Sequence, residues 1–133
     1  MILKLMITLN ILSTFQPLKS QELPFAVSNP VIKNIYTNYP KDGIWVQLPK
    51  GTKEITFYVE AENTETVLFW LIPTGTQTWT ERKLIGYDIR EDVTDNNFSF
   101  TWHIDRSYLL DHLFIQAIGE EKVEQDMINL YME

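Results

Sequence analysis

The chain has 133 residues, enough for one ordinary domain and too few for two. Eleven lysines and arginines stand against 18 aspartates and glutamates, and this net charge of −7 argues against a nucleic-acid groove, which needs basic residues to neutralise phosphates. The chain has no cysteine, which excludes disulfides, thiolate metal sites and a cysteine nucleophile.

Residues 1–28 differ in composition from the rest of the chain. Lys4 precedes an apolar run over 5–15, and Ala26-Val27-Ser28 resembles a cleavage site, so the pattern predicts an imperfect signal peptide. The alternative is an N-terminal extension of the domain. The run is too short to span a membrane, which takes about 20 apolar residues. The expected domain is therefore 29–133, which carries nine basic and 17 acidic residues and holds the negative charge.

From residue 29 onward, apolar and polar residues alternate with a period of two, which is typical of half-buried β-strands. In 53–62 the residues Ile55, Phe57, Val59 and Ala61 share one face, and 98–104 alternates in the same way with larger side chains. The segment 67–72 is apolar on both faces, as in a central strand. We expect strands near 31–36, 44–48, 53–62, 66–72, 83–88, 98–104, 113–119 and 126–131.

Turn-forming residues separate these segments, at 41–43, 49–51, 73–75 and 95–97. Residues 119–122 are expected to close a hairpin between the last two strands. Only one short helical turn is expected, at 107–112 with Ser107 as its N-cap. Short strands at this spacing predict an all-β, antiparallel sandwich or barrel of about seven to eight strands.

Five segments resemble, in order, the strands of bacterial immunoglobulin-like modules. They are 51–61, 67–71, LIGYD at 84–88, FSFTW at 98–102 and HLFIQA at 112–117. The resemblance implies an immunoglobulin-like or fibronectin-III-like sandwich in a secreted or cell-surface protein. It implies a non-catalytic structural, spacer or adhesive role, with other domains or surface proteins as partners. The chain departs from the family pattern at 119–122 and in a longer loop at 74–81.

Within this fold, Phe57, Phe69, Phe100 and Trp102 are expected to fill the space between two sheets about 10 Å apart. A glycine inside a strand marks a bulge or the close approach of another backbone, and Gly86 is expected to do so.

No catalytic constellation is evident in the sequence. A serine–histidine–acid triad could in principle be composed from Ser107, His112 and Asp105 or Asp111. The sequence around these residues contains neither a nucleophile elbow nor a Gly-rich oxyanion loop, so it does not support a triad. His103 and His112 alone do not make a zinc site. We expect no enzyme, although a small hydrolase is a distant third alternative. We also expect no cofactor: the acids Asp88, Asp92 and Asp95 suit calcium but fit a solvated acidic loop better.

The tryptophans suggest an alternative, a carbohydrate-binding module. Trp79 lies in a polar loop without apolar sequence neighbours, where an exposed indole could stack on a sugar ring, and Gln77 and Trp45 are the further candidates for ligand binding. On 66–72, Leu68, Trp70 and Ile72 share the outer face. This stripe is either a contact with a partner or is covered by the N-terminal segment or by the long loop. The oligomeric state is not readable from the sequence.

Overall fold

The computed structural model describes residues 28–75 and 79–133, so the predicted signal peptide lies outside the described residues. The described chain is almost entirely β-strand, with one short 3-10 helix, η1, at Trp79–Glu81. The strands are β1 Val31–Thr37, β2 Lys41–Asp42, β3 Trp45–Leu48, β4 Glu54–Glu62, β5 Thr66–Pro73, β6 Lys83–Ile89, β7 Asn97–His103, β8 Leu109–Ile118 and β9 Val123–Met132.

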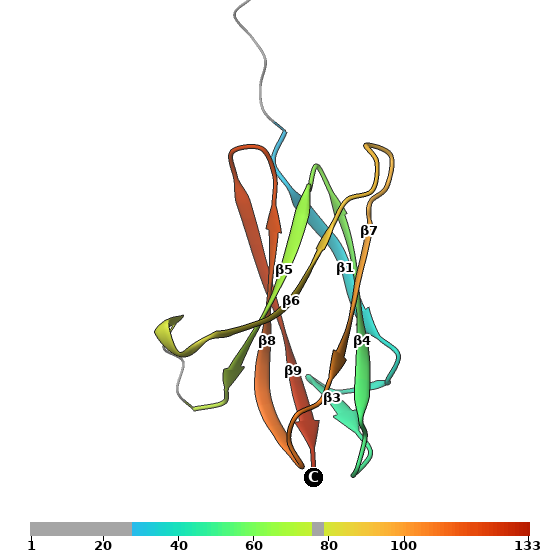
Figure 1. Cartoon of the computed structure of the whole chain (residues 1–133), viewed down its shortest axis with the longest axis vertical. Coiled ribbons are helices and arrows are strands. Elements are labelled where there is room, and N and C mark those ends of the chain that lie inside the picture. Colours follow the sequence, from blue (N-terminus) through green and yellow to red (C-terminus); the bar gives the residue numbers. More distant parts are fainter. Residues whose placement is uncertain (1–27, 76–78) are drawn as a thin grey trace, which may run out of the picture.

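The strands form two sheets that pack face to face, which confirms the predicted all-β sandwich. The narrow sheet has three strands in the order β1-β4-β7, and the broad sheet has six in the order β2-β3-β9-β8-β5-β6. Neighbouring strands are antiparallel except for β3 and β9, which run parallel. In Figure 1, β5, β8 and β9 of the broad sheet lie on the left, and β1, β4 and β7 on the right.

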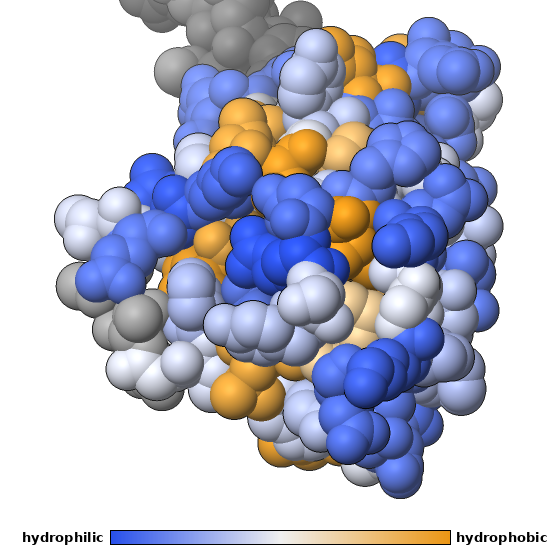
Figure 2. Space-filling model, turned by 60° about the horizontal axis from the view of Figure 1, so that its bottom comes forward, coloured by the Kyte–Doolittle hydropathy of each residue, from blue (hydrophilic) through white to orange (hydrophobic). Residues whose placement is uncertain are grey.

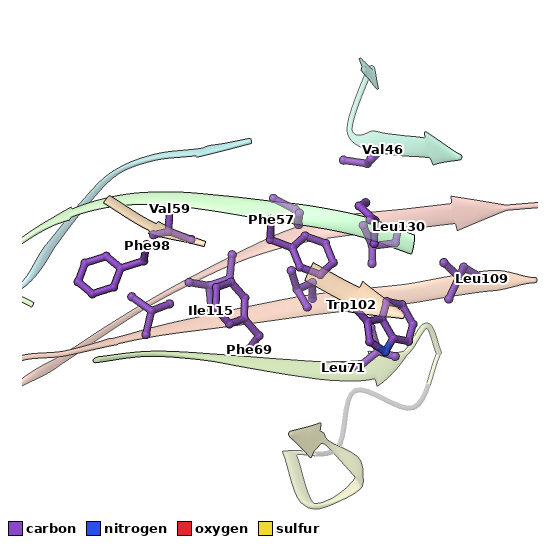
Figure 3. Close-up of a cluster of buried hydrophobic side chains, with 14 of the residues drawn as sticks. Val46, Phe57, Val59, Phe69, Leu71, Phe98, Trp102, Leu109, Ile115 and Leu130 are labelled. Atoms are coloured by element: carbon purple, nitrogen blue, oxygen red, sulfur yellow. The ribbon is translucent and has the colours of Figure 1, made fainter. Parts of the chain in front are cut away.

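The core lies between the two sheets and follows the predicted alternation. β4 buries Ile55, Phe57, Val59 and Ala61 while its intervening residues stay more accessible. The rings of Phe57 and Phe69, from opposite sheets, lie 6.0 Å apart between their centroids. Figure 3 shows these side chains and Trp102 pointing into the space between the ribbons. Aromatic residues thus supply the large buried area that a sandwich without disulfides needs.

Gly86 in β6 lies at the expected bulge, but the group that approaches it closely is a side-chain ring and not another backbone. The pairing of β5 with β6 shifts register between Phe69 and Trp70, next to the Phe69–Gly86 pair. A Cβ atom on Gly86 would lie 2.3 Å from the ring of Phe100, so only glycine leaves room for that ring. The ring of Phe100 in turn lies 5.5 Å from that of Phe69. The missing side chain therefore lets the two sheets approach each other near β6 and β7.

The predicted helical turn at 107–112 is wrong. β8 begins at Leu109, which pairs with Met132 of β9, and the segment alternates with Leu109 and Asp111 buried and Leu110 exposed. Backbone pairing with β9 and burial of Leu109 outweigh the local N-cap signal of Ser107. The predicted hairpin at 119–122 is confirmed, because the Gly119 amide donates to the Lys122 carbonyl at 2.8 Å.

Candidate functional site

The outer face of the broad sheet carries an unusual set of side chains. Residues paired across antiparallel strands share a face, so the registers identify every outward position of this sheet from β3 to β6. None of them is Asp, Glu, Lys or Arg. We call this surface the broad face, and it comprises Trp45, Gln47, Thr66, Leu68, Trp70, Ile72, Leu84, Tyr87, Ile89, Leu110, His112, Phe114, Gln116, Ile118, Val123, Gln125, Met127, Asn129 and Tyr131.

Many apolar members of the broad face are accessible to solvent. Tyr87 and Ile89 of the edge strand β6 are 60% and 59% exposed, and further exposed positions on the face are Leu84, Leu110, Val123, Met127 and Tyr131. Figure 2 looks toward the lower end of the sandwich and shows apolar residues at the surface there, scattered among hydrophilic ones. Contiguous exposed apolar surface is typical of an interaction site, whereas single exposed residues are ordinary.

An aromatic cluster occupies part of the broad face. Trp79 of η1 lies with its ring centroid 5.3 Å from that of Phe114 in a T-shaped contact and 6.1 Å from that of Trp70. The Arg82 guanidinium carbon lies 4.1 Å from the Trp79 centroid and 4.5 Å from the Trp70 centroid. The Trp70 indole N–H donates to Gln116 Oε1 at 2.6 Å. Stacking and cation–π attraction hold the loop against the sheet.

These contacts differ from the environment that the sequence suggested for Trp79. Its polar sequence neighbours concealed Trp70 and Phe114, which come from β5 and β8, and the indole is half-buried. Gln77 lies outside the described residues. Trp45 contacts Tyr131 edge-on, with centroids 6.4 Å apart. The described ring contacts therefore do not join Trp45 and Trp79 into one aromatic cluster.

The stripe of Leu68, Trp70 and Ile72 does face outward from β5, because Val67, Phe69 and Leu71 are buried on the opposite side. Leu68 and Trp70 are half-buried, and Trp79 from the long loop covers part of Trp70. Ile72 is only 1% exposed, so it lies covered and is not presented to solvent. The loop thus covers one end of the stripe and leaves β6 and the neighbouring outward residues accessible.

The carboxylates in and beside the acidic loop between β6 and β7 accept hydrogen bonds from nearby residues of the loop and of β7. Asp92 accepts from the Thr94 amide at 2.8 Å and from its hydroxyl at 2.5 Å, and these hydrogen bonds lower the pKa of the Asp92 carboxyl. Asp95 accepts from the Asn97 amide at 3.0 Å, and Asp88 accepts from the Ser99 amide at 2.8 Å. Among residues 28–75 and 79–133, no group of three or more histidine, aspartate or glutamate side chains is placed to hold a metal ion.

The polar residues considered for a triad do not converge. Asp111 and His112 are consecutive in β8 and therefore point to opposite faces of the broad sheet. Asp111 is buried and accepts from Arg106 Nη1 at 3.3 Å and from the Leu110 amide at 3.0 Å. His112 Nδ1 lies 2.6 Å from Asn129 Oδ1 on the broad face. His103, on the narrow sheet, lies 3.6 Å from Glu54.

The outer face of the narrow sheet differs in character, and sequence reasoning did not single it out. We call it the narrow face; its outward positions are Val31, Asn34 and Tyr36 of β1, Glu54, Thr56, Tyr58, Glu60 and Glu62 of β4, and Asn97, Ser99, Thr101 and His103 of β7. Tyr36 and Tyr58 stack with centroids 4.9 Å apart and planes 14° from parallel. A shallow depression of about 230 Å³ lies beside them.

Comparison with known proteins adds no assignment. No family model matches the chain, and no curated protein is similar to it at a significant level. None of the helical structure in the described residues is long and apolar enough to cross a membrane. The function is therefore argued from the two faces.

Proposed function

We propose that this chain is a non-catalytic, immunoglobulin-like accessory module that is exported to the bacterial cell surface and has an adhesive role there. The strand order supports the proposal, since β1-β4-β7 facing β9-β8-β5 resembles the arrangement of the A-B-E and G-F-C strands in immunoglobulin-like sandwiches. The apolar segment at the N-terminus supports export. Adhesion would take place through the broad face, and its partner would be a second copy of this chain.

The observation that carries this proposal is the lack of charged side chains among the outward residues of β3, β9, β8, β5 and β6, although Asp42 of the short edge strand β2 pairs with Trp45 at the margin of this face. The chain has a net charge of −7, and two copies therefore repel each other over most orientations. They can approach through the broad face without bringing carboxylates together. The outward residues of these five strands include no acid or lysine that the interface would bury unpaired, and the Arg82 guanidinium on this face lies against the rings of Trp70 and Trp79.

The extent of the broad face is sufficient for a specific contact. Strands lie about 4.8 Å apart and outward residues about 6.8 Å apart along a strand, so the outward positions together cover roughly 600 Å². Side chains from η1 and from Arg82 add to this area. Stable interfaces bury about 800 Å² on each partner. The area of the broad face therefore approaches that of a specific dimer.

The carbohydrate-binding alternative at Trp79 has less support. Phe114 and Trp70 contact that indole and the Arg82 guanidinium lies near its ring, so less of the ring is free for a sugar than in an isolated exposed tryptophan. The cluster instead forms part of the apolar surface that the adhesive proposal uses.

Sedimentation velocity of the full chain over a range of concentrations tests the proposal. We expect a reversible dimer in the wild type. Ile89→Lys and Tyr87→Lys place a charge at exposed positions of the broad face and should weaken the dimer at least ~10-fold, because each would bring an unpaired charge into the contact. Thr101→Lys, at an exposed position of the narrow face, is the matched control and should leave the dimer unchanged.

Three results would overturn the proposal. The first is a wild type that stays monomeric at the highest soluble concentration. The second is a dimer that Ile89→Lys and Tyr87→Lys do not weaken. The third is a dimer that Thr101→Lys weakens as strongly as they do, because it would place the contact on the narrow face.

A further inference from the structure

The stacked tyrosines of the narrow face form a surface with no evident role in the core. Tyr36 is 52% exposed and Tyr58 is half-buried, on the two neighbouring strands β1 and β4. Their rings lie 4.9 Å apart and nearly parallel, so each holds the other in a fixed orientation. An aromatic surface that is already ordered loses little entropy when a ligand stacks on it.

A small residue on the third strand leaves space beside this pair. Tyr36, Tyr58 and Ser99 are paired across the three strands β1, β4 and β7. The serine side chain is much shorter than the two tyrosines, so it leaves space beside the ring of Tyr58. The result is the depression of about 230 Å³, lined by Tyr36, Tyr58, Val59, Asn97, Phe98 and Ser99. This volume is below the ~300–1,000 Å³ of sites for drug-sized ligands, so it suits a single ring.

Hydrogen-bonding groups surround the depression on the same face. Asn97 pairs with Glu60 in the row next to Tyr58 and Ser99. The structure gives the Asn97 side-chain amide, the Ser99 hydroxyl and the Glu60 carboxylate no hydrogen bond to another residue within 28–75 and 79–133, and the hydrogen bonds of Asn97 and Ser99 come from their backbone amides. These groups offer acceptors and donors that are available to a ligand.

We propose that this depression binds a pyranose ring of a neutral polysaccharide. The apolar C–H face of a sugar ring would stack against the tyrosine rings. Its hydroxyl groups act as both donors and acceptors, which matches the Asn97 amide, the Ser99 hydroxyl and the Glu60 carboxylate. A flat, exposed sheet face would let the polysaccharide chain continue beyond the bound ring.

Two other ligand classes fit this surface less well. Anionic ligands would meet Glu60 and Glu62, which face outward from β4 beside the tyrosines. Proline-rich peptides also bind to aromatic grooves, but a proline has no N–H to donate to the Glu60 carboxylate or to the Asn97 carbonyl. The neutral sugar is the class that uses both the rings and the acceptors.

The test is a titration of the isotope-labelled full chain with cellohexaose, laminarihexaose and, for comparison, a proline-rich decapeptide, followed by amide chemical shifts. We expect one hexasaccharide to give saturable shifts centred on Tyr58 and on residues 97–99. Ser99→Leu, which fills the depression and keeps the tyrosine pair, should abolish binding. Tyr58→Phe keeps the ring and should bind within about 3-fold of the wild type, which corresponds to the loss of one modest hydrogen bond.

Tyr108→Ala is the matched control, because Tyr108 is an exposed tyrosine (66%) that does not line the depression. It should leave the affinity unchanged. The proposal is wrong if neither hexasaccharide gives saturable shifts at these residues, if only the proline-rich peptide does, or if Ser99→Leu binds as well as the wild type. The site lies on the sheet opposite the broad face, so this result and the sedimentation result are independent of each other.

Discussion

The two outer faces of this sandwich have opposite chemistry although they belong to one small chain. The broad face has mainly apolar and amide side chains at its outward positions, with Thr66 and His112 among them and no acid or lysine, whereas the narrow face carries Glu54, Glu60 and Glu62. On the narrow face, charged groups also pair locally: Lys33 lies 3.5 Å from Glu62, with both side chains about half exposed.

This difference indicates that the absence of charge on the broad face is not a property of the whole surface. The inner faces of both sheets must be apolar to form the core, but the outer faces are free to vary. The narrow face carries the polar side chains that are usual on a surface in contact with water. The broad face lacks charged side chains at its outward positions over five adjacent strands, and contact with a partner would explain this difference.

The largest effect that we predict concerns charge inside the broad sheet. Asp111 is buried on its inner face and pairs with Arg106. Arg106→Ala leaves this carboxylate without its cation, and we expect a loss of about 2–3 kcal/mol in the free energy of unfolding, reduced from the value for a fully buried pair because Arg106 is partly exposed. Urea denaturation measures it.

Lys83→Ala is the control for that experiment. It removes the cation of an exposed pair, in which Lys83 Nζ lies 3.6 Å from Asp105, and it should change stability by less than about 0.5 kcal/mol. Equal losses in the two variants would mean that the buried position of Asp111 does not matter, and that the broad sheet tolerates charge as the narrow sheet does.

A smaller effect is expected from Arg82, the cation stacked on the broad face. Arg82→Met keeps a long apolar side chain over Trp70 and Trp79 but removes the charge, so we expect a loss of about 1 kcal/mol. Thermal unfolding followed by tryptophan fluorescence measures this change. Arg90→Met, at a position without a described ring contact, should be neutral. A neutral Arg82→Met would show that the aromatic contacts alone hold η1 against the sheet.

The smallest effect is expected in the connection between the two sheets. The hydrogen bonds from Thr94 lower the pKa of Asp92 in the folded state, so the ionised carboxylate stabilises the fold above its unfolded pKa. That stabilisation is lost as the pH falls below about 4 and through the lower folded pKa. Asp92→Asn should therefore show a slightly smaller loss of stability between neutral pH and pH 3 than the wild type. Glu91→Gln, which keeps the Thr94 hydrogen bonds, should follow the wild type.

Much of the fold was predictable because it depends on local alternation. The period of two in 53–62 places Ile55, Phe57 and Val59 in the core, and the same rule identified β7. Gly86 indicated the bulge between β5 and β6, whereas the close neighbour that it accommodates is the ring of Phe100 and not the expected backbone. By contrast, the helical turn at 107–112 was wrong, because the N-cap signal of Ser107 is local and pairing with β9 is not.

The candidate sites were harder to predict because each joins distant segments. The contacts of Trp79 come from Trp70 and Phe114, on two strands that flank it in space but not in sequence. The stack of Tyr36 on Tyr58 depends on the register of β1 against β4, which includes a shift between Ile32 and Asn34. The alternation of residues within one strand does not indicate how that strand is aligned with its neighbour.

The parallel pairing of β3 with β9 has a mechanical consequence. The register runs from the Trp45–Asn129 pair to the Leu48–Met132 pair, so that an early strand is paired with the last one. A pull that draws the N-terminal side of β3 away from the C-terminal side of β9 acts along both strands in opposite directions. It loads the hydrogen bonds between them together in shear, whereas a hairpin under tension opens one bond at a time. Such a pairing resists stretching, which the adhesive role proposed above would require.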